Sequence, residues 1–234
     1  MSAPSPTPEL QIPLGDFVRF IRQLSHDLRN HLNAAELQSA YLGEISTDPE
    51  IKAEIKRLRT MVSETGAALQ KLSGTLGTVK LTTIPYGAAD FVEDLRQKLG
   101  MVMPEYAADI AWTTELPTDT QLEVDPQLLQ AALAEIFANA FRHSRGVGPI
   151  AASAAIDGAQ FCLTIREPKT TFEASTATWG SEPLRTIKQG HYGLGLHRAR
   201  TIFEAHEGEF GAAFDPTSAA LVTTIRLPVS PPGA

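Results

Sequence analysis

The sequence predicts two folded parts: an antiparallel hairpin of two long helices, and then an α/β sandwich in which helices cover one mixed sheet. Three observations support this prediction. Apolar residues recur at steps of three and four over the first third of the chain, strand-like and helix-like runs alternate beyond it, and the pattern changes over residues 80–87. We expect a flexible tail over residues 1–13, the hairpin over 14–80 and the α/β domain over 82–230.

The hairpin follows from two runs with the same period. The first runs over residues 17–45, with His31 at a seam position, and the second over 51–79; the breaker at 46–50 separates them. Because the connection is short, the helices should be antiparallel neighbours. Two helices with narrow apolar seams bury little surface alone, so we expect a second copy of the chain to complete a four-helix bundle.

The second domain is predicted element by element from its periods and turn signals. Helices are expected over residues 87–101, 126–144 and 193–208, and strands over 109–116, 121–125, 149–157, 158–167, 209–214 and 220–228. Asp157-Gly158 is a two-residue hairpin signal. Residues 168–189 show no period, and a loop of this length is usually retained for function.

Composition limits the classes of partner and compartment. The net charge of -7 argues against binding to nucleic acid or to an anionic membrane surface. The single cysteine, Cys162, has no intramolecular partner and no Cys/His cluster has zinc-like spacing, which predicts a reducing compartment, the cytoplasm, and no structural metal. The sequence has no run of about 18 apolar residues, so it does not predict membrane insertion. The Pro- and Ser-rich start is typical of a flexible tail and not of a signal peptide.

The first chemistry-bearing segment is LSHDLRNHLNA, residues 24–34. His26 lies two positions past the seam residue Leu24, so its side chain should point away from the seam, and Asn30 shares that exposed face. A neutral imidazole is a nucleophile near pH 7, and the Asp27 carboxylate can hold one ring N–H and leave the other nitrogen free. Asn30 could orient a water or an incoming carboxylate. Alone, the pattern more often describes a solvated histidine.

The second segment is EIFANAFRHS, residues 135–144. Glu135 and Asn139 are spaced i,i+4 on one helix face, and Arg142 and His143 follow. A carboxamide oxygen can bind Mg2+, a nearby carboxylate can orient an attacking group, and cationic side chains can reach phosphate oxygens. The alternative interpretation is the polar edge of an amphipathic helix.

The third segment is GHYGLGLHRAR, residues 190–200, in which Gly190, Gly193 and Gly195 precede a helix. Glycines let the backbone approach phosphates closely, and a helix N-terminus supplies free N–H groups. The spacing fits neither a Rossmann fingerprint nor a Walker A loop. A glycine cluster of this kind, taken alone, is more often a hinge.

Together and in this order, the three segments resemble the core of a two-component sensor histidine kinase over residues 14–228. The first is similar to its phosphoacceptor box, the second to its asparagine box and the third to its glycine box. The resemblance implies a dimerisation and phosphotransfer hairpin, an ATP-binding sandwich of the type shared with gyrase, and ATP and Mg2+ as cofactors. Its partners would be a response-regulator receiver domain and, because sensor segments are missing here, an upstream sensor or regulatory protein.

The resemblance also implies a role for each matching residue. His26 becomes the phosphorylated imidazole, Asp27 its base partner, and Asn30 the position where kinases that also dephosphorylate their partner keep Thr or Asn. In the second domain, Asn139 holds Mg2+, Glu135 stands one turn before it, Arg142 and His143 face the phosphates, and Gly190, Gly193 and Gly195 shape the phosphate pocket.

One departure concerns the base of the nucleotide. The family has Asp-x-Gly-x-Gly at a strand end, where the Asp accepts a hydrogen bond from the adenine amino group, whereas this chain has IREPKTT over residues 165–171. Glu167 takes the place of that Asp, and the glycines are absent.

Three functions therefore stay open. The leading hypothesis is a homodimeric histidine kinase that phosphorylates His26 from ATP, transfers the group to an aspartate of a response regulator and possibly dephosphorylates that regulator. A second is a histidine phosphotransferase that no longer binds ATP and relays phosphoryl groups between regulators through His26. A third is a dimeric scaffold without chemistry. Nucleotide affinity separates the first two, and phosphate transfer from His26 excludes the third.

Overall fold

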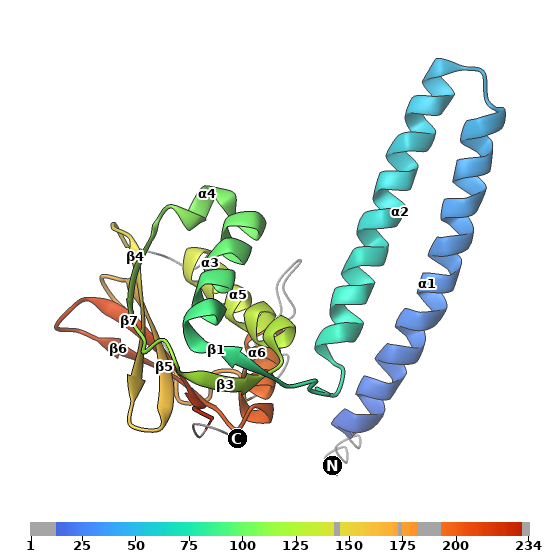
Figure 1. Ribbon diagram of the computed structural model, residues 1–234. Coiled ribbons are helices and arrows are strands. Elements are labelled where there is room, and N and C mark those ends of the chain that lie inside the picture. The colour runs from blue at the N-terminus through green and yellow to red at the C-terminus, as the bar shows by residue number, and fades with distance from the viewer. Residues whose placement is uncertain (1–12, 143–145, 173–174, 182–192, 231–234) are drawn as a thin grey trace, which may run out of the picture. The chain divides into compact units, whose positions relative to one another are not determined.

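The computed structural model describes residues 13–142, 146–172, 175–181 and 193–230 (Figure 1). The chain divides into two compact units, Met1–Gly77 and Thr78–Ala234. The first holds two helices, and the second holds the sheets and the remaining helices.

The first unit is an antiparallel hairpin of α1 (Leu14–Ile45) and α2 (Pro49–Thr75). Asp48 caps α2, since its carboxylate accepts the amide N–H of Glu50 at 2.8 Å, and Pro49 begins the helix without needing a donor. At the other end α2 stops at Thr75, four residues before the apolar spacing does. The Arg22 guanidinium of α1 donates to the Leu76 carbonyl just beyond it, at 3.1 Å.

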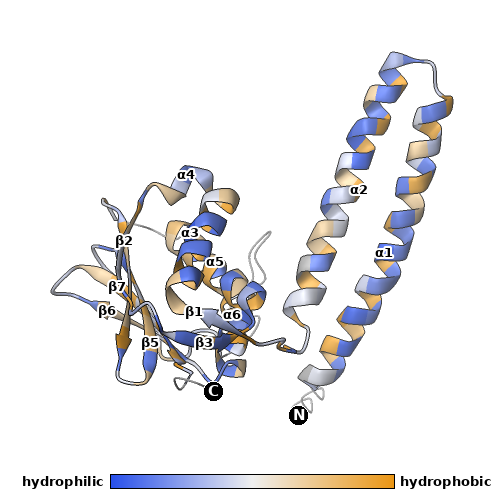
Figure 2. Ribbon diagram, viewed as in Figure 1, coloured by the Kyte–Doolittle hydropathy of each residue, from blue (hydrophilic) through white to orange (hydrophobic). Residues whose placement is uncertain are grey.

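The face of α1 that contacts α2 is mostly small or polar. Ser25 and Ser39 are buried on it, and the Glu36 carboxylate forms an ion pair with Arg59 of α2 at 2.8 Å. From Leu24 onward, the apolar positions predicted for α1 stay exposed: Leu24 is 41% and Leu28 40% exposed. Figure 2 shows apolar and polar residues alternating along both helices.

The second unit is a two-layer α/β sandwich. Its elements are, in chain order, β1 (Ile84–Gly87), α3 (Ala88–Val102), α4 (Pro104–Ala107), β2 (Ile110–Glu115), β3 (Gln121–Val124), α5 (Pro126–Arg142), β4 (Ile150–Asp157), β5 (Gln160–Pro168), α6 (Gly195–Ala205), β6 (Glu209–Asp215) and β7 (Ala220–Pro228). Five strands form a mixed sheet in the order β2-β4-β5-β7-β6, in which only the β2–β4 pair is parallel. Helices α3, α5 and α6 lie on one face of this sheet (Figure 1).

The core lies between the sheet and these helices. Alternate residues of β4 and β5 are buried, as a sheet with one covered face requires. Four phenylalanines from both layers are fully buried: Phe91, Phe137, Phe161 and Phe203. This packing fixes α5 and α6, which carry the second and third chemistry-bearing segments, against the same sheet.

The predicted architecture is confirmed at the level of a helical region followed by an α/β domain, with local differences. The single mixed sheet is wrong in one respect, because β3 pairs with β1, a strand that the sequence analysis missed, in a separate two-stranded sheet. The short helix α4 was also missed. At the β4–β5 hairpin, Asp157 pairs with Gln160, so the turn residues are 158–159, one position later than predicted; Gly158 has φ 59° there.

Asp125 and His206 join the start of α5 to the end of α6. The Asp125 carboxylate accepts the amide N–H groups of Leu128 and Thr82, each at 3.0 Å. His206 is buried; its Nε2 accepts the Asp125 amide N–H at 3.0 Å, so Nδ1 carries the proton and donates to the Ile202 carbonyl at 2.7 Å. Burial works to raise the pKa of Asp125, but these amide hydrogen bonds outweigh it and hold the pKa below its usual value.

Candidate functional site

One candidate site lies on the exposed side of α1. The His26 side chain is 65% exposed, and its Nδ1 lies 3.3 Å from Asp27 Oδ1. The same carboxylate oxygen accepts a hydrogen bond from Gln23 Nε2 at 2.9 Å, one helical turn earlier. With the proton on Nδ1 donated to Asp27, the lone pair on Nε2 is available for attack.

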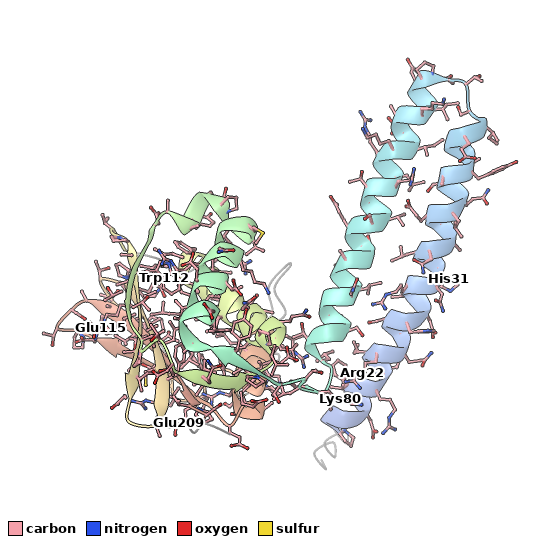
Figure 3. The ribbon with its side chains drawn as sticks, viewed as in Figure 1. Arg22, His31, Lys80, Trp112, Glu115 and Glu209 are labelled. Carbon is pink, nitrogen blue, oxygen red and sulfur yellow. The ribbon has the colours of Figure 1, made fainter. Side chains whose placement is uncertain are left out.

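The other polar residues around His26 divide into two groups. Asn30 and His31 are exposed on α1, whereas Arg22 is half-buried. Figure 3 labels Arg22 and His31 on α1. Because the Arg22 guanidinium is bound to the Leu76 carbonyl, it supports the end of α2.

A separate candidate site, within the α/β unit, joins α5 to the start of α6. Glu135 and Asn139 are half-buried on α5, and Gly195 is the first residue of α6. A Cβ atom on Gly195 would lie 2.7 Å from Glu135 Cδ and closer still to its carboxylate oxygen, so any larger residue here requires the Glu135 side chain or the start of α6 to shift. The second and third segments, some 50 residues apart in the sequence, therefore meet at a contact between the Glu135 side chain and the α6 backbone.

The N-terminus of α6 has features of an anion site. Its N-cap residue, Leu194, has no side chain that could accept an amide hydrogen bond, and Gly193 just before it has φ 64°, which favours glycine. N–H groups at such an end are available to an anion. Arg142 is exposed at the last residue of α5. His143 and Gly190, the remaining predicted members of this cluster, lie outside the described residues.

Glu167 occupies the buried face of β5, and its carboxylate is engaged. Lys169 Nζ lies 2.6 Å from Glu167 Oε1, and the two side chains are only 4% and 7% exposed, Lys169 being the more buried. The Lys169 amide N–H also donates to the Ala219 carbonyl at 2.8 Å, which fixes the backbone beyond the strand end.

No family model matches the chain, but comparisons with individual proteins find relatives. Sensor histidine kinase MtrB of Mycobacterium leprae is 25% identical over 244 residues, which cover 91% of this chain and 42% of that protein. The bacteriophytochrome of Pseudomonas aeruginosa is 25% identical over 228 residues, covering 90% of this chain and 29% of that protein. This chain thus spans less than half the length of these relatives.

Solved structures share the fold. Full-length ShkA in complex with AMPPNP superposes with a TM-score of 0.68 at 18% identity, over 92% of this chain and 47% of that one. Histidine kinase AdeS of Acinetobacter baumannii gives a TM-score of 0.52 at 18% identity, over 87% of this chain and 97% of that one. The chain is similar to the core of sensor histidine kinases. None of the helices in the described ranges has the length and apolar composition needed to cross a membrane.

Three of the described residues take part in contacts that the sequence analysis did not single out. Lys169 occupies the position of the first glycine in the Asp-x-Gly-x-Gly motif that the resemblance implies. The sequence analysis noted only that this glycine is absent, not that a lysine replaces it. His197 and Arg200 of α6 bind the segment before the undescribed part of the long loop. His197 Nδ1 lies 2.8 Å from the Gly180 carbonyl, and Arg200 Nε donates to the Trp179 carbonyl at 2.7 Å. No local sequence pattern predicts these two contacts.

Proposed function

We propose that the chain is a histidine kinase core in which His26 takes the γ-phosphoryl group of ATP and passes it to an aspartate of a response-regulator receiver domain. The contact between Glu135 and Gly195 carries this proposal, because it joins the second and third segments at one place on the fold. The exposed His26 imidazole with Asp27 beside it supplies the acceptor. The AMPPNP bound in ShkA supports a nucleotide as the donor.

The residues of α5 and α6 fit Mg2+ and the phosphates of a nucleotide. The Asn139 carboxamide offers the hard oxygen ligand that Mg2+ prefers, and Glu135 adds a carboxylate on the same face. The N–H groups at the start of α6 would face the phosphates, with Arg142 as a further cation. Mg2+ would neutralise charge on the transferring group.

At His26 the proposed transfer balances as a displacement at phosphorus. The Nε2 lone pair forms the new N–P bond while the bond from Pγ to the bridging oxygen breaks, and ADP leaves with that electron pair. Positive charge develops on the imidazole ring as the bond forms. The Asp27 carboxylate at Nδ1 stabilises this charge and can take the proton, which leaves a neutral phosphorylated ring.

The second transfer, to the regulator, requires His26 to be reachable. Its exposure on α1 meets this requirement. Asn30 lies one turn further along the same helix, where its carboxamide could orient a water molecule on the phosphorylated aspartate of the regulator. We therefore include dephosphorylation of the regulator in the proposal and assign Asn30 to it.

Phosphate should be found on His26 and not on its exposed neighbour His31 after incubation with MgATP. Mass spectrometry under neutral or basic conditions preserves the acid-labile phosphoramidate and locates it. His31→Ala is the matched control, since it removes another exposed imidazole from the same helix. Phosphate on the His26→Ala variant, or its loss from His31→Ala alone, would contradict the proposal.

We also propose that the hairpin works as a homodimer. Large apolar side chains stay exposed on both helices, which is costly for an isolated hairpin and marks an interaction surface. They are Phe20, Leu24, Leu28, Leu37, Tyr41, Leu42, Ile45, Ile51, Leu58 and Met61. A second copy packed against this stripe would complete a four-helix bundle.

Leu28→Glu should weaken this dimer by about 100-fold or more, because it places an unpaired charge in the apolar interface. Light scattering coupled to size exclusion, over a dilution series, measures the effect. Asn33→Glu adds the same charge at an exposed polar position of α1 and should leave the dimer intact. If Leu28→Glu dimerises as tightly as the parent chain, the proposed interface is wrong.

Isothermal titration with MgATP tests the nucleotide as the phosphoryl donor. Micromolar binding would exclude a phosphotransferase that takes its phosphoryl group on His26 from a phosphorylated regulator and needs no nucleotide.

A further inference from the structure

We propose that Arg200 is a positioning residue of the nucleotide site. It docks residues 175–181 against the first turn of α6, and this docking holds the N–H groups of that turn where they meet the phosphates. The inference rests on the proposed function and adds to it a residue that acts through the backbone it holds. We call residues 175–181 the docked segment.

The Arg200 guanidinium links three elements. Its Nε donates to the Trp179 carbonyl of the docked segment at 2.7 Å, and its Nη2 donates to the Phe210 carbonyl of β6 at 3.2 Å. Its central carbon also lies 5.3 Å from the centroid of the Phe210 ring, a cation–π distance. A planar guanidinium presents its N–H groups in a fixed fork, so it can hold both carbonyls at once. Because β6 is the last strand of the sheet, Arg200 ties the docked segment and the sheet edge to α6.

Further contacts fasten the docked segment along its length. Near its start, Thr176 Oγ1 donates to the Ala212 carbonyl of β6. Near its end, His197 Nδ1 of α6 lies 2.8 Å from the Gly180 carbonyl, and this nitrogen carries the proton because a carbonyl only accepts. Between them, the Trp179 side chain packs against the core of the α/β unit. The docked segment is therefore held by both α6 and β6.

Gly180 brings the docked segment onto the first turn of α6. It has φ 74°, which favours glycine, and a Cβ there would lie 2.6 Å from the Leu196 carbonyl oxygen. Leu196 is the second residue of α6 and directly follows Gly195, whose backbone contacts the Glu135 side chain. The first turn of α6 is thus supported from two sides, by α5 and by the docked segment.

This turn depends on such support. The first N–H groups of a helix have no partner within the helix, and the N-cap residue Leu194 has no side chain that could accept from them. The proposed function requires the same N–H groups to be in place for the phosphates. When the docked segment detaches, the turn loses one of its two supports. We therefore expect the site to bind phosphates only in the docked fraction of the molecules.

The test measures docking and nucleotide affinity on the same full chain. The chain has two tryptophans, Trp112 and Trp179, so Trp112→Phe leaves Trp179 as the only one. Trp112 packs against Phe137 with ring centroids 5.6 Å apart, and phenylalanine retains an aromatic contact there (Figure 3). Quenching of Trp179 by acrylamide, with the urea-unfolded chain as the exposed reference, gives the docked fraction. Isothermal titration with the Mg2+ complex of the β,γ-imido analogue of ATP gives the affinity.

In this background, Arg200→Ala should bind the analogue about tenfold more weakly, which is the loss of about one hydrogen bond. The docked fraction should fall to about one tenth, because the apparent dissociation constant is the intrinsic one divided by the competent fraction. By linkage, a saturating concentration of the analogue should then restore the protection of Trp179. A merely structural role would expose Trp179 without this response to nucleotide. Arg200→Lys keeps the charge without the fork and should recover part of both losses.

Glu204→Ala is the matched control. It removes the ion-pair partner of Arg200, 3.4 Å away on the same helix, and leaves the two carbonyl contacts, so affinity and docking should not change. If Arg200→Ala fails to fold, Thr176→Val keeps the test valid. It has a similar shape and removes the hydrogen bond to Ala212 from the far end of the docked segment. Its docked fraction and its affinity should fall by the same factor.

Three results overturn the inference: a variant that exposes Trp179 at unchanged affinity, a variant that loses affinity while Trp179 stays protected, and an Arg200→Ala chain that changes in neither. In each of them the parent chain binds the analogue, so the proposed function stands. A parent chain that binds no analogue contradicts both, and the absence of phosphate on His26 after incubation with MgATP then identifies the failure of the proposed function.

Discussion

Asp27→Asn is expected to slow phosphorylation of His26 by about 10²-fold, the lower end of what a positioned acid or base contributes. The Asp27 carboxylate lies 3.3 Å from His26 Nδ1 and can only accept a hydrogen bond there. An asparagine can present its NH2 group instead, which favours the tautomer with the proton on Nε2 and removes the attacking lone pair. It also cannot neutralise the charge that develops on the ring. The initial rate of phosphohistidine formation with MgATP measures the effect.

Gln23→Ala is the matched control for this prediction. Gln23 donates to the same Asp27 oxygen at 2.9 Å from an exposed position, so its removal leaves the carboxylate and the imidazole in place. We expect only a few-fold change in rate for Gln23→Ala, and full retention of the phosphorylation site. Equal rates for Asp27→Asn and the parent chain would show that the carboxylate plays no part in the transfer.

Gly195→Ala is expected to reduce phosphorylation of His26 by about 10²-fold, as a displacement of about 1 Å near the reacting groups can do. The new methyl group cannot occupy its ideal position, because Glu135 Cδ would be 2.7 Å away and Glu135 Cγ 3.0 Å away. Either the Glu135 side chain or the first turn of α6 must move. Both belong to the proposed phosphate and Mg2+ site, so affinity for MgATP should fall together with the rate.

Gly100→Ala provides a control in which the same methyl group meets no neighbour. Gly100 lies within α3 and a Cβ there has nothing within 4 Å, so alanine should stabilise the helix by about 0.5–1 kcal/mol and leave phosphorylation unchanged. Coupling is tested with Glu135→Ala. If Gly195→Ala acts by displacing Glu135, the double variant of Gly195→Ala and Glu135→Ala should raise the activation free energy of phosphorylation by less than the sum of the two single variants. Strict additivity would place the effect elsewhere.

Most of the fold could be predicted because each element carries its own local signal. The period of α1 and α2, the Pro126 start of α5 and the alternation along β4 and β5 are all properties of short windows. The strand β1 has four residues and depends on pairing with β3, so its evidence is tertiary and not local. The face of α1 that contacts α2 could not be predicted either. It includes Ser25, Ser39 and the Glu36 ion pair, whereas hydrophobic periodicity identifies only faces made of apolar residues.

The candidate site was predictable in composition but not in its contacts. Its residues could be selected because the three segments are more polar, or richer in glycine, than a helix or loop requires. The order of the segments then indicated that they belong to one function. The burial of the Lys169 side chain depends on β5, on Phe172 and on the backbone at Ala219 together, so no motif in the sequence describes it. A lysine next to a proline in a loop reads as a solvated charge until the sheet that buries it is known.

The central claim is that a nucleotide bound at α5 and α6 supplies the phosphoryl group on His26. The most direct measurement is transfer of label from γ-labelled MgATP to the parent chain, to His26→Ala and to Asn139→Ala under one set of conditions. The account predicts base-stable, acid-labile label on the parent chain, none on His26→Ala, and at least a tenfold loss on Asn139→Ala, where Mg2+ loses its proposed ligand. Equal labelling of the parent chain and Asn139→Ala, or no label on the parent chain while a phosphorylated regulator labels His26, would contradict it.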